Sequence, residues 1–238
     1  MAVENAKFEN AVKIIENVLA SGRKTLLPDE AMDVIKSSGI STPDYALAKT
    51  AREALTAAGS MGYPVVLKIV SPDVLHKSDV GGVIVGVEDE KEIGRNYDEI
   101  MNSLIKKVPD ADIMGILVEK QMPKTTEVIV GGIRDEQFGA TVMFGLGGIF
   151  VELFKDVVFR IAPVTEEEAL EMIREIKGYA ILNGYRGAER LDIQQLARTI
   201  VTISELISDI DEIKEVELNP LFVYKEGVTA VDARIIIK

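Results

Sequence analysis

The chain has 238 residues, of which 47% are hydrophobic and 28% charged, the balance of a globular protein. Its 39 acidic residues outnumber its 27 Lys and Arg residues, and the resulting net charge of −12 disfavours a nucleic-acid groove. The absence of cysteine excludes disulfides, thiolate nucleophiles and Cys-ligated zinc. We find neither a signal peptide nor the roughly 20 apolar residues of a membrane span, so we expect a cytoplasmic protein that handles small molecules or proteins. The lack of Trp and Cys, together with Lys- and Glu-rich helices, favours a thermophilic source.

Helical periodicity dominates the first 60 residues. Apolar residues at helical spacing predict helices over residues 8–19, 28–38 and 47–58, and a glycine near the end of each is a stop signal. The β-branched runs at 64–70 and 82–87 then predict two strands.

The segment between these two strands, residues 71–81, is rich in Ser, Pro, Asp and Gly, which is typical of a loop. A helix over 93–104 and a buried strand over 113–118 follow. Residues 119–123 then break the strand with charged residues and a proline, and we place a boundary between two lobes there.

We therefore expect an α+β fold with an N-terminal lobe at residues 1–118, which carries the loop, and a C-terminal lobe at residues 119–238. The second lobe should contain strands at 127–134 and 140–144, a glycine-rich turn at 145–148, a helix opened by a capping box at 165–168, a longer helix from Asp192, and strands at 215–219 and 229–236.

The last two strands predict a hairpin with a polar face. If its turn is centred on residues 225–226, Asn219 faces Asp232 and Glu217 faces Arg234, and the alternation of a strand puts all four side chains on one face. Two carboxylates and an amide near one point suit a hard cation such as Mg²⁺ bridged to phosphates. Ordinary alternation with a solvent-facing salt bridge explains the same pattern.

Lys68 lies inside an apolar predicted strand. It is either an edge residue whose aliphatic stem follows the apolar surface, or a fixed positive charge that holds phosphate oxygens.

Two glycine segments also allow either a structural or a phosphate-binding interpretation. Gly81-Gly82 and the 145–148 turn are simple turns, or places where backbone N–H groups approach phosphates, and neither matches a P-loop or dinucleotide fingerprint.

His76 is the only histidine, and it falls in the loop between Lys68 and Gly81. A lone histidine is usually structural or merely exposed. With a pKa near 6.5, however, much of an imidazole is neutral and nucleophilic at cytoplasmic pH. The chain has no cysteine or second histidine for a transition-metal site, and no nucleophile elbow of a hydrolase. Nucleophilic catalysis on phosphorus is the chemistry that remains for His76.

Four motifs resemble one known family over nearly the whole chain, from about residue 28 to residue 238. The chain is similar to the β subunits of ADP-forming acetyl-CoA synthetases, which are ATP-grasp proteins of the acyl-CoA synthetase superfamily. The motifs are Tyr-Pro-Val-Val-Leu-Lys-Ile-Val-Ser-Pro from residue 63 with Leu-His-Lys-Ser-Asp-Val-Gly-Gly from 75, Glu-Val-Ile-Val-Gly from 127, Phe-Gly-Leu-Gly-Gly-Ile-Phe-Val-Glu from 144, and Glu-Leu-Asn-Pro from 217 with Val-Asp-Ala-Arg from 231.

The resemblance implies an ATP-grasp fold, with two α+β lobes that sandwich a nucleotide, and the reaction acyl-CoA + ADP + phosphate ⇌ carboxylate + ATP + CoA. It implies a CoA-binding α subunit, which we expect in an α2β2 heterotetramer, and Mg²⁺ as cofactor. His76 would be the phosphoryl carrier. The resemblance assigns nucleotide binding to Lys68, Glu119 and Glu127, and metal binding to Asn219 and Asp232. From the residues themselves we add Gly81, Gly82, Gly147 and Gly148 as candidates for nucleotide binding and Glu217 as a candidate metal ligand.

The related succinyl-CoA synthetase β subunit continues into a further domain beyond the match, so we expect that part on another polypeptide and no activity from this chain alone. Two rival functions remain open. The first is an ATP-grasp carboxylate ligase that forms an acyl-phosphate and needs no phosphohistidine. The second is a non-catalytic nucleotide-binding subunit that regulates another chain.

Overall fold

The computed structural model describes residues 5–74, 77–148 and 156–238, so His76 lies outside the described residues. The chain divides into two compact units. The large unit contains Met1–Leu26, Glu30–Thr42 and Lys124–Lys238, and the small unit contains Leu27–Asp29 and Pro43–Pro123. Each unit combines an antiparallel sheet with helices, which confirms the predicted α+β class.

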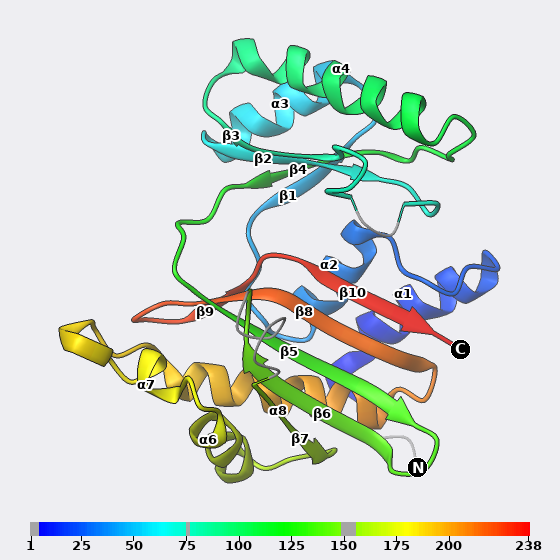
Figure 1. The fold of residues 1–238 in the computed structure, drawn as a ribbon. Coiled ribbons are helices and arrows are strands. Elements are labelled where there is room, and N and C mark those ends of the chain that lie inside the picture. The colour runs from blue at the N-terminus through cyan, green and yellow to red at the C-terminus, as the bar shows by residue number, and fades with distance from the viewer. Residues whose placement is uncertain (1–4, 75–76, 149–155) are drawn as a thin grey trace. The chain divides into compact units, whose positions relative to one another are not determined.

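In the small unit, the described strands form one antiparallel sheet in the order β1-β4-β2-β3. Its strands are β1 (Tyr45–Ala48), β2 (Val65–Val70), β3 (Val83–Val87) and β4 (Gly115–Lys120). Helices α3 (Ala51–Met61) and α4 (Glu90–Lys107) lie together on one face of this sheet (Figure 1). Thr50 and Asp89 cap the two helices by accepting hydrogen bonds from first-turn N–H groups.

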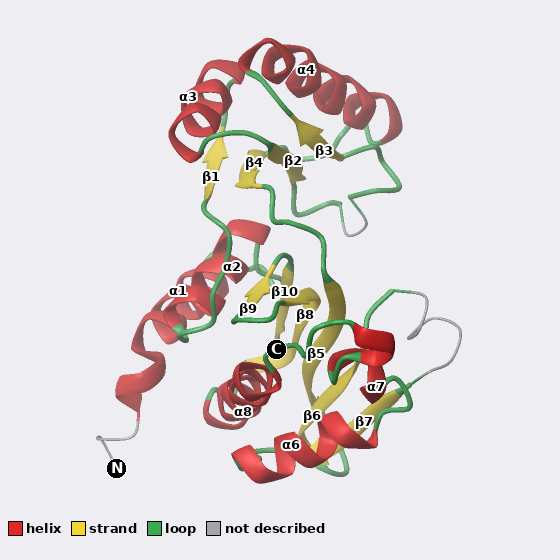
Figure 2. Cartoon of the chain, turned by 90° about the vertical axis from the view of Figure 1, so that its left-hand side faces the viewer, coloured by secondary structure: helices red, strands yellow, loops and turns green. Residues whose placement is uncertain are grey.

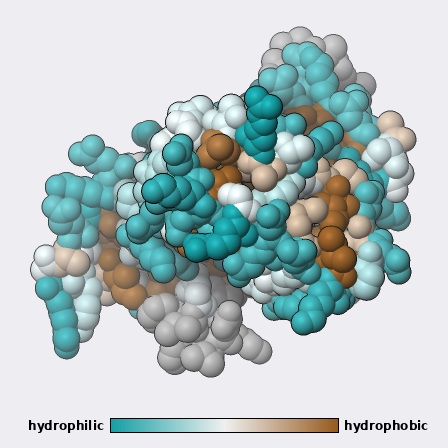
Figure 3. All heavy atoms as spheres, turned by 90° about the horizontal axis from the view of Figure 1, so that it is seen from above, coloured by the Kyte–Doolittle hydropathy of each residue, from teal (hydrophilic) through white to brown (hydrophobic). Residues whose placement is uncertain are grey.

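Strand alternation decides which side chains the helices cover. Leu67 and Ile69 of β2 are fully buried in the core that β2 and β4 form with α3 and α4. Lys68 and Val70 point to the opposite face, where Val70 packs with Leu117. The outer surface of the helices, seen from above, is mostly hydrophilic with separate hydrophobic spots (Figure 3), consistent with the exposed Ile105 of α4.

The described strands of the large unit form a second antiparallel sheet in the order β10-β8-β5-β6-β7, with β9 paired to β8. Helix α8 (Ile193–Asp209) packs on β5, β6 and β8, and α6 (Glu166–Glu175) packs on α8, β6 and β7 (Figure 2). The short helices α7 (Tyr179–Leu182) and η2 (Tyr185–Gly187) connect them. The strands are β5 (Thr126–Asp135), β6 (Gly139–Leu146), β7 (Val157–Ile161), β8 (Ile213–Val223), β9 (Val228–Ala230) and β10 (Ala233–Ile237).

The N-terminal helices belong to the large unit because the segment after α1 runs along the last strand. After η1 (Asn5–Phe8) and α1 (Glu9–Ala20), the Leu26 N–H donates to the carbonyl of Ile235 at 3.0 Å. The Ile237 N–H donates in turn to the carbonyl of Lys24 at 2.8 Å, and helix α2 (Pro28–Ser37) follows.

The observed units differ from the expected lobes, 1–118 and 119–238, in two respects. The boundary lies after Pro123, because β4 continues through Glu119 and Lys120, which pair with β1 and β2. Most of the first 42 residues join the large unit, through backbone hydrogen bonds that a boundary based on local composition does not reveal.

Two local predictions were wrong, and one strand was missed. Residues 45–48, expected partly as helix, form β1, because Tyr45–Ala48 pair with β4 and the helix begins only after the N-cap Thr50. Strand β7 was not predicted. The strand expected over 229–236 is interrupted at Val231–Asp232 and divides into β9 and β10. No helix in the described ranges is long and apolar enough to span a lipid bilayer.

Candidate functional site

The C-terminal hairpin has the predicted register. Ala233 pairs with Leu218 and Arg234 with Glu217, and the Asn219 N–H donates to the carbonyl of Asp232 at 3.2 Å. The predicted face alternation is also confirmed, since Leu218 and Ala233 are buried while the four polar side chains are exposed or partly exposed. Asn219 and Asp232 therefore lie side by side, at the gap between β9 and β10.

A hydrogen-bonded network links the polar side chains of this hairpin. Asn219 Nδ2 donates to Glu217 Oε1 at 3.0 Å, and Arg234 Nη2 donates to Glu217 Oε2 at 2.7 Å. Arg234 also forms an ion pair with Glu215 on the neighbouring part of β8. Partial burial of the guanidinium opposes its charge, but the hydrogen bonds and charges of Glu217 and Glu215 outweigh that effect and raise the pKa of Arg234.

Asn219 and Asp232 fit a magnesium ion that is shared with phosphates. No group of three or more His, Cys, Asp or Glu side chains among the described residues is arranged to hold a metal by itself. Mg²⁺ in nucleotide enzymes typically takes one or two protein oxygens and completes its shell with phosphate oxygens and water. One carboxylate and one amide oxygen suit that role. Glu217 fits it less well, because the guanidinium of Arg234 lies 2.7 Å from one of its oxygens.

Lys68 and Glu119 form a buried ion pair in the small unit. Their N–O distance is 2.8 Å, and their side chains are 9% and 1% exposed. Lys68 lies on β2, between β3 and β4 in the sheet, so the snorkelling edge-residue interpretation is wrong. The geometry explains the pair, because Lys68 faces Leu117 while Glu119 faces Val66, which makes the two charged residues diagonal neighbours on one face. A phosphate at Lys68 would share its charge with Glu119.

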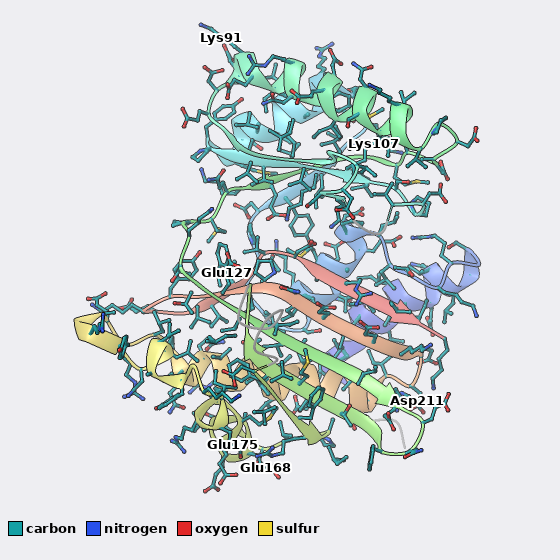
Figure 4. The ribbon with its side chains drawn as sticks, in the orientation of Figure 1. Lys91, Lys107, Glu127, Glu168, Glu175 and Asp211 are labelled. Carbon is teal, nitrogen blue, oxygen red and sulfur yellow. The ribbon has the colours of Figure 1, made fainter. Side chains whose placement is uncertain are left out.

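Glu127 lies beside the glycine-rich turn, near the start of β5 (Figure 4). The Gly147 N–H donates to the Glu127 carbonyl at 2.8 Å, and a Cβ at Gly147 would lie 3.1 Å from Glu127 backbone atoms. A Cβ at Gly148 would lie 3.8 Å from Glu127 Oε2. The large unit thus brings together three of the residues predicted to bind nucleotide, and glycine lets the two segments approach closely.

Gly81 and Gly82 have a packing role that the sequence does not show. A Cβ at Gly82 would lie 2.3 Å from Ile69 Cγ2 and 2.9 Å from the Lys77 carbonyl oxygen. Gly81 has a φ of 69°, which favours glycine. These glycines let the end of the loop lie against β2, where the Ile69 N–H donates to the Gly82 carbonyl at 2.7 Å.

Two residues of α4 that were not predicted hold the same end of the loop. Ser103 Oγ donates to the Val80 carbonyl at 2.7 Å, and Lys107 Nζ, labelled in Figure 4, donates to the Asp79 carbonyl at 2.8 Å. At the other end of the loop, the Asp112 N–H donates to Asp73 Oδ2 at 2.7 Å. Sequence spacing gave no signal for these contacts, because they join residues 23 to 39 positions apart.

The comparisons with known proteins agree with this picture. Residues 17–237 match the model of an ATP-grasp domain. The chain is 48% identical to the β subunit of acetate–CoA ligase [ADP-forming] I of Pyrococcus furiosus, over 97% of this chain and 99% of that one. It is 45% identical to acetate–CoA ligase [ADP-forming] I of Archaeoglobus fulgidus, where the match covers 96% of this chain and 33% of that longer protein.

A solved structure of the acetyl-coenzyme A synthetase 1 of Candidatus Korarchaeum cryptofilum, in complex with coenzyme A and Ca-AMPCP, matches with a TM-score of 0.94 at 46% identity. That match covers 96% of this chain and all of the other. Another structure of the same synthetase contains a phosphorylated phosphohistidine segment and has a TM-score of 0.89. The chain belongs to the ATP-grasp family and, within it, to the β subunits of ADP-forming acetate–CoA ligases.

Proposed function

We propose that this chain is the nucleotide-binding subunit of an ADP-forming acyl-CoA synthetase and that His76 carries the phosphoryl group to ADP. The observation that carries the proposal is the side-by-side placement of Asn219 and Asp232 on the polar face of the hairpin, in a chain of this family. His76 is the only histidine of the chain, so a phosphohistidine formed on it has no competitor.

The proposed transfer takes up one proton and needs no other reactant. The bond between phosphorus and the imidazole nitrogen of phospho-His76 breaks, while a bond forms between phosphorus and a β-phosphate oxygen of ADP. The imidazole nitrogen takes up a proton from solvent as phosphorus leaves it, so the products are ATP and neutral histidine. Mg²⁺ held by Asn219 and Asp232 would neutralise charge on the phosphate oxygens, and such electrostatic stabilisation, together with positioning, is how phosphoryl-transfer enzymes accelerate the reaction.

The chain's own residues would bind and orient the nucleotide. Asn219 and Asp232 would hold the metal, and Lys68 would add positive charge at the phosphates. We assign Glu119, Glu127 and the backbone of Gly147 and Gly148 to nucleotide binding, which the contact between Glu127 and the glycine turn supports. The packing of Gly81 and Gly82 supports a structural role for these two residues. We also assign both of them to nucleotide binding.

We infer that a CoA-binding α subunit completes the enzyme, in an α2β2 heterotetramer in the cytoplasm. The Archaeoglobus relative supports a partner, because the segment that matches this chain is 33% of that single polypeptide. The Pyrococcus furiosus relative, of which 99% is matched, is named a β subunit, and this name supports a partner on a separate polypeptide. Alone, the chain should bind ADP or ATP and make no acyl-CoA.

His76→Ala in the reconstituted enzyme tests the proposal. The variant should lose net ATP synthesis, because no phosphohistidine can form on this subunit, while calorimetry should show unchanged Mg-ADP affinity. Acid-labile, base-stable phosphate should appear on the wild-type chain and not on the variant. Retention of more than a few per cent of wild-type ATP synthesis would contradict the carrier role and favour direct transfer through an acyl-phosphate.

A further inference from the structure

The amide of Asn219 has a defined orientation in the hairpin. Its Nδ2 donates to Glu217 Oε1 at 3.0 Å. The other oxygen of the same carboxylate accepts from Arg234 Nη2 at 2.7 Å, and Arg234 also binds Glu215. These contacts form a chain from Glu215 through Arg234 and Glu217 to Asn219, all on one face of β8 and β10.

The chemistry of Glu217 fixes which end of the amide faces it. An ionised carboxylate only accepts hydrogen bonds, so it pairs with the amide nitrogen of Asn219 and repels the amide oxygen. The amide oxygen is the atom that binds a hard cation, whereas the amide nitrogen cannot. The bond to Glu217 thus directs the oxygen away from Glu217 and leaves it available as a ligand. Arg234 restrains the carboxylate in turn, because it holds the oxygen that Asn219 does not use.

We propose that Glu217 and Arg234 are positioning residues that orient Asn219 for the magnesium ion of the bound nucleotide, and that Glu217 is not itself a metal ligand. This inference rests on the proposed function of the hairpin as the metal site. It replaces the assignment of Glu217 as a ligand, because the Arg234 guanidinium and the Asn219 side-chain N–H both face its carboxylate, and their positive charge opposes a cation at the same place. Partners of this kind, which hold a ligand from behind, typically change metal affinity by about 10- to 100-fold.

Glu217→Gln provides the first test. Glutamine keeps the shape but presents either a donor or an acceptor to Asn219, so the amide is no longer held in one orientation. We expect Mn²⁺, used as a paramagnetic probe with ADP, to bind about 10- to 100-fold more weakly, while ADP in EDTA binds as in the wild type. Glu175→Gln is the matched control, because Glu175 forms its ion pair with Arg160 and has no contact with the hairpin network. It should change Mn²⁺ affinity by less than about threefold, as expected for a partly exposed ion pair.

Arg234→Met separates a positioning role from direct ligation by the sign of its effect. If Glu217 were a ligand, removal of the nearby positive charge would leave Mn²⁺ binding unchanged or strengthen it. If Arg234 holds Glu217 against Asn219, the same change weakens Mn²⁺ binding. Stronger or unchanged binding in Arg234→Met, or wild-type binding in Glu217→Gln, would overturn the inference. A further variant, Asp232→Asn, distinguishes a failure of this positioning inference from a failure of the proposed function. If that variant binds Mn²⁺ with ADP as the wild type does, the hairpin is not the metal site and both fail.

Discussion

The two sheets use the same kind of ion pair in different surroundings. Each sheet has one face covered by helices and carries charged side chains on the other. In the small unit, Lys68 and Glu119 are 9% and 1% exposed. In the large unit, Arg234 and Glu217 are 47% and 21% exposed. Because the first pair is buried, the fold depends on both of its members for stability. The second pair is exposed to solvent, so it contributes little to stability and mainly fixes side-chain orientation.

The difference follows from the cost of desolvation. A charge that loses its partner inside a protein cannot recover the interaction with water, so removal of one member of a buried pair is strongly destabilising. A charge at the surface regains hydration and loses little. The comparison therefore predicts that removal of one charge of the buried pair lowers stability in addition to any effect on nucleotide binding, whereas the same change in the exposed pair acts mainly on ligand binding.

The largest expected effect is that of Lys68→Met. It leaves the Glu119 carboxylate buried without its cationic partner and should lower the free energy of unfolding by about 3–5 kcal/mol. The double variant Lys68→Met/Glu119→Leu should recover most of that loss, since apolar side chains can replace a buried pair. Urea denaturation of the three proteins measures both values. A single variant as stable as the wild type would show that burial does not distinguish the two sheets.

The second prediction compares two glycines of the small unit. Gly82→Ala places a Cβ within 2.3 Å of Ile69 Cγ2, so we expect a loss of about 1–3 kcal/mol from overpacking. Gly94→Ala is the matched control, because no atom lies within 4 Å of the added Cβ in helix α4. It should stabilise the protein by about 0.5–1 kcal/mol. Thermal unfolding that moves both variants in the same direction would contradict the packing argument.

The third prediction concerns the large unit. Asp232→Asn should change the free energy of unfolding by less than about 0.5 kcal/mol, because Asp232 lies at the partly exposed gap between β9 and β10. The same change should weaken Mg²⁺-dependent ADP binding by more than about tenfold. Calorimetry with and without Mg²⁺, beside a urea titration, checks the two parts. A destabilised protein with unchanged Mg²⁺ dependence would make Asp232 a structural residue.

The smallest effect is expected from an exposed carboxylate. The backbone N–H of Thr165, followed by its hydroxyl, lowers the pKa of Glu168 in the capping box of α6 from its usual 4.5. A lowered folded-state pKa stabilises the protein above the unfolded value near 4.5, and that contribution is lost as the pH falls through the lowered value. Glu168→Gln should thus reduce the urea midpoint slightly at pH 7 and flatten its decline below pH 4.5. Parallel pH profiles of variant and wild type would exclude this contribution.

The polar face of the hairpin was predictable because a strand has a period of two. Once the turn is centred on residues 225–226, the pairing of Asn219 with Asp232 follows from counting, and the structure confirms it. The hydrogen bonds that Glu217 accepts from Asn219 and Arg234 were not predicted in detail. They depend on side-chain rotamers, which sequence spacing does not determine.

The contacts that define the small unit could not be predicted, because their partners lie far apart in sequence. Lys68 and Glu119 are 51 residues apart, and nothing in their local patterns identifies them as neighbours. Strands β1 and β7 were missed for a related reason. Both are short and their residues are only partly buried for the most part, so strand pairing rather than hydrophobic periodicity defines them.

The pairing of the segment after α1 with the last strand has a consequence for folding during synthesis. Residues 24–26 complete the edge of the large sheet by pairing with Ile235–Ile237. Because these partners are almost the last residues to be synthesised, residues 24–26 leave the ribosome long before they can pair. The small unit, which is built from residues within 27–123, can fold in that interval. We therefore expect early protease resistance in the nascent small unit, while the N-terminal helices stay open to chaperones until β10 emerges.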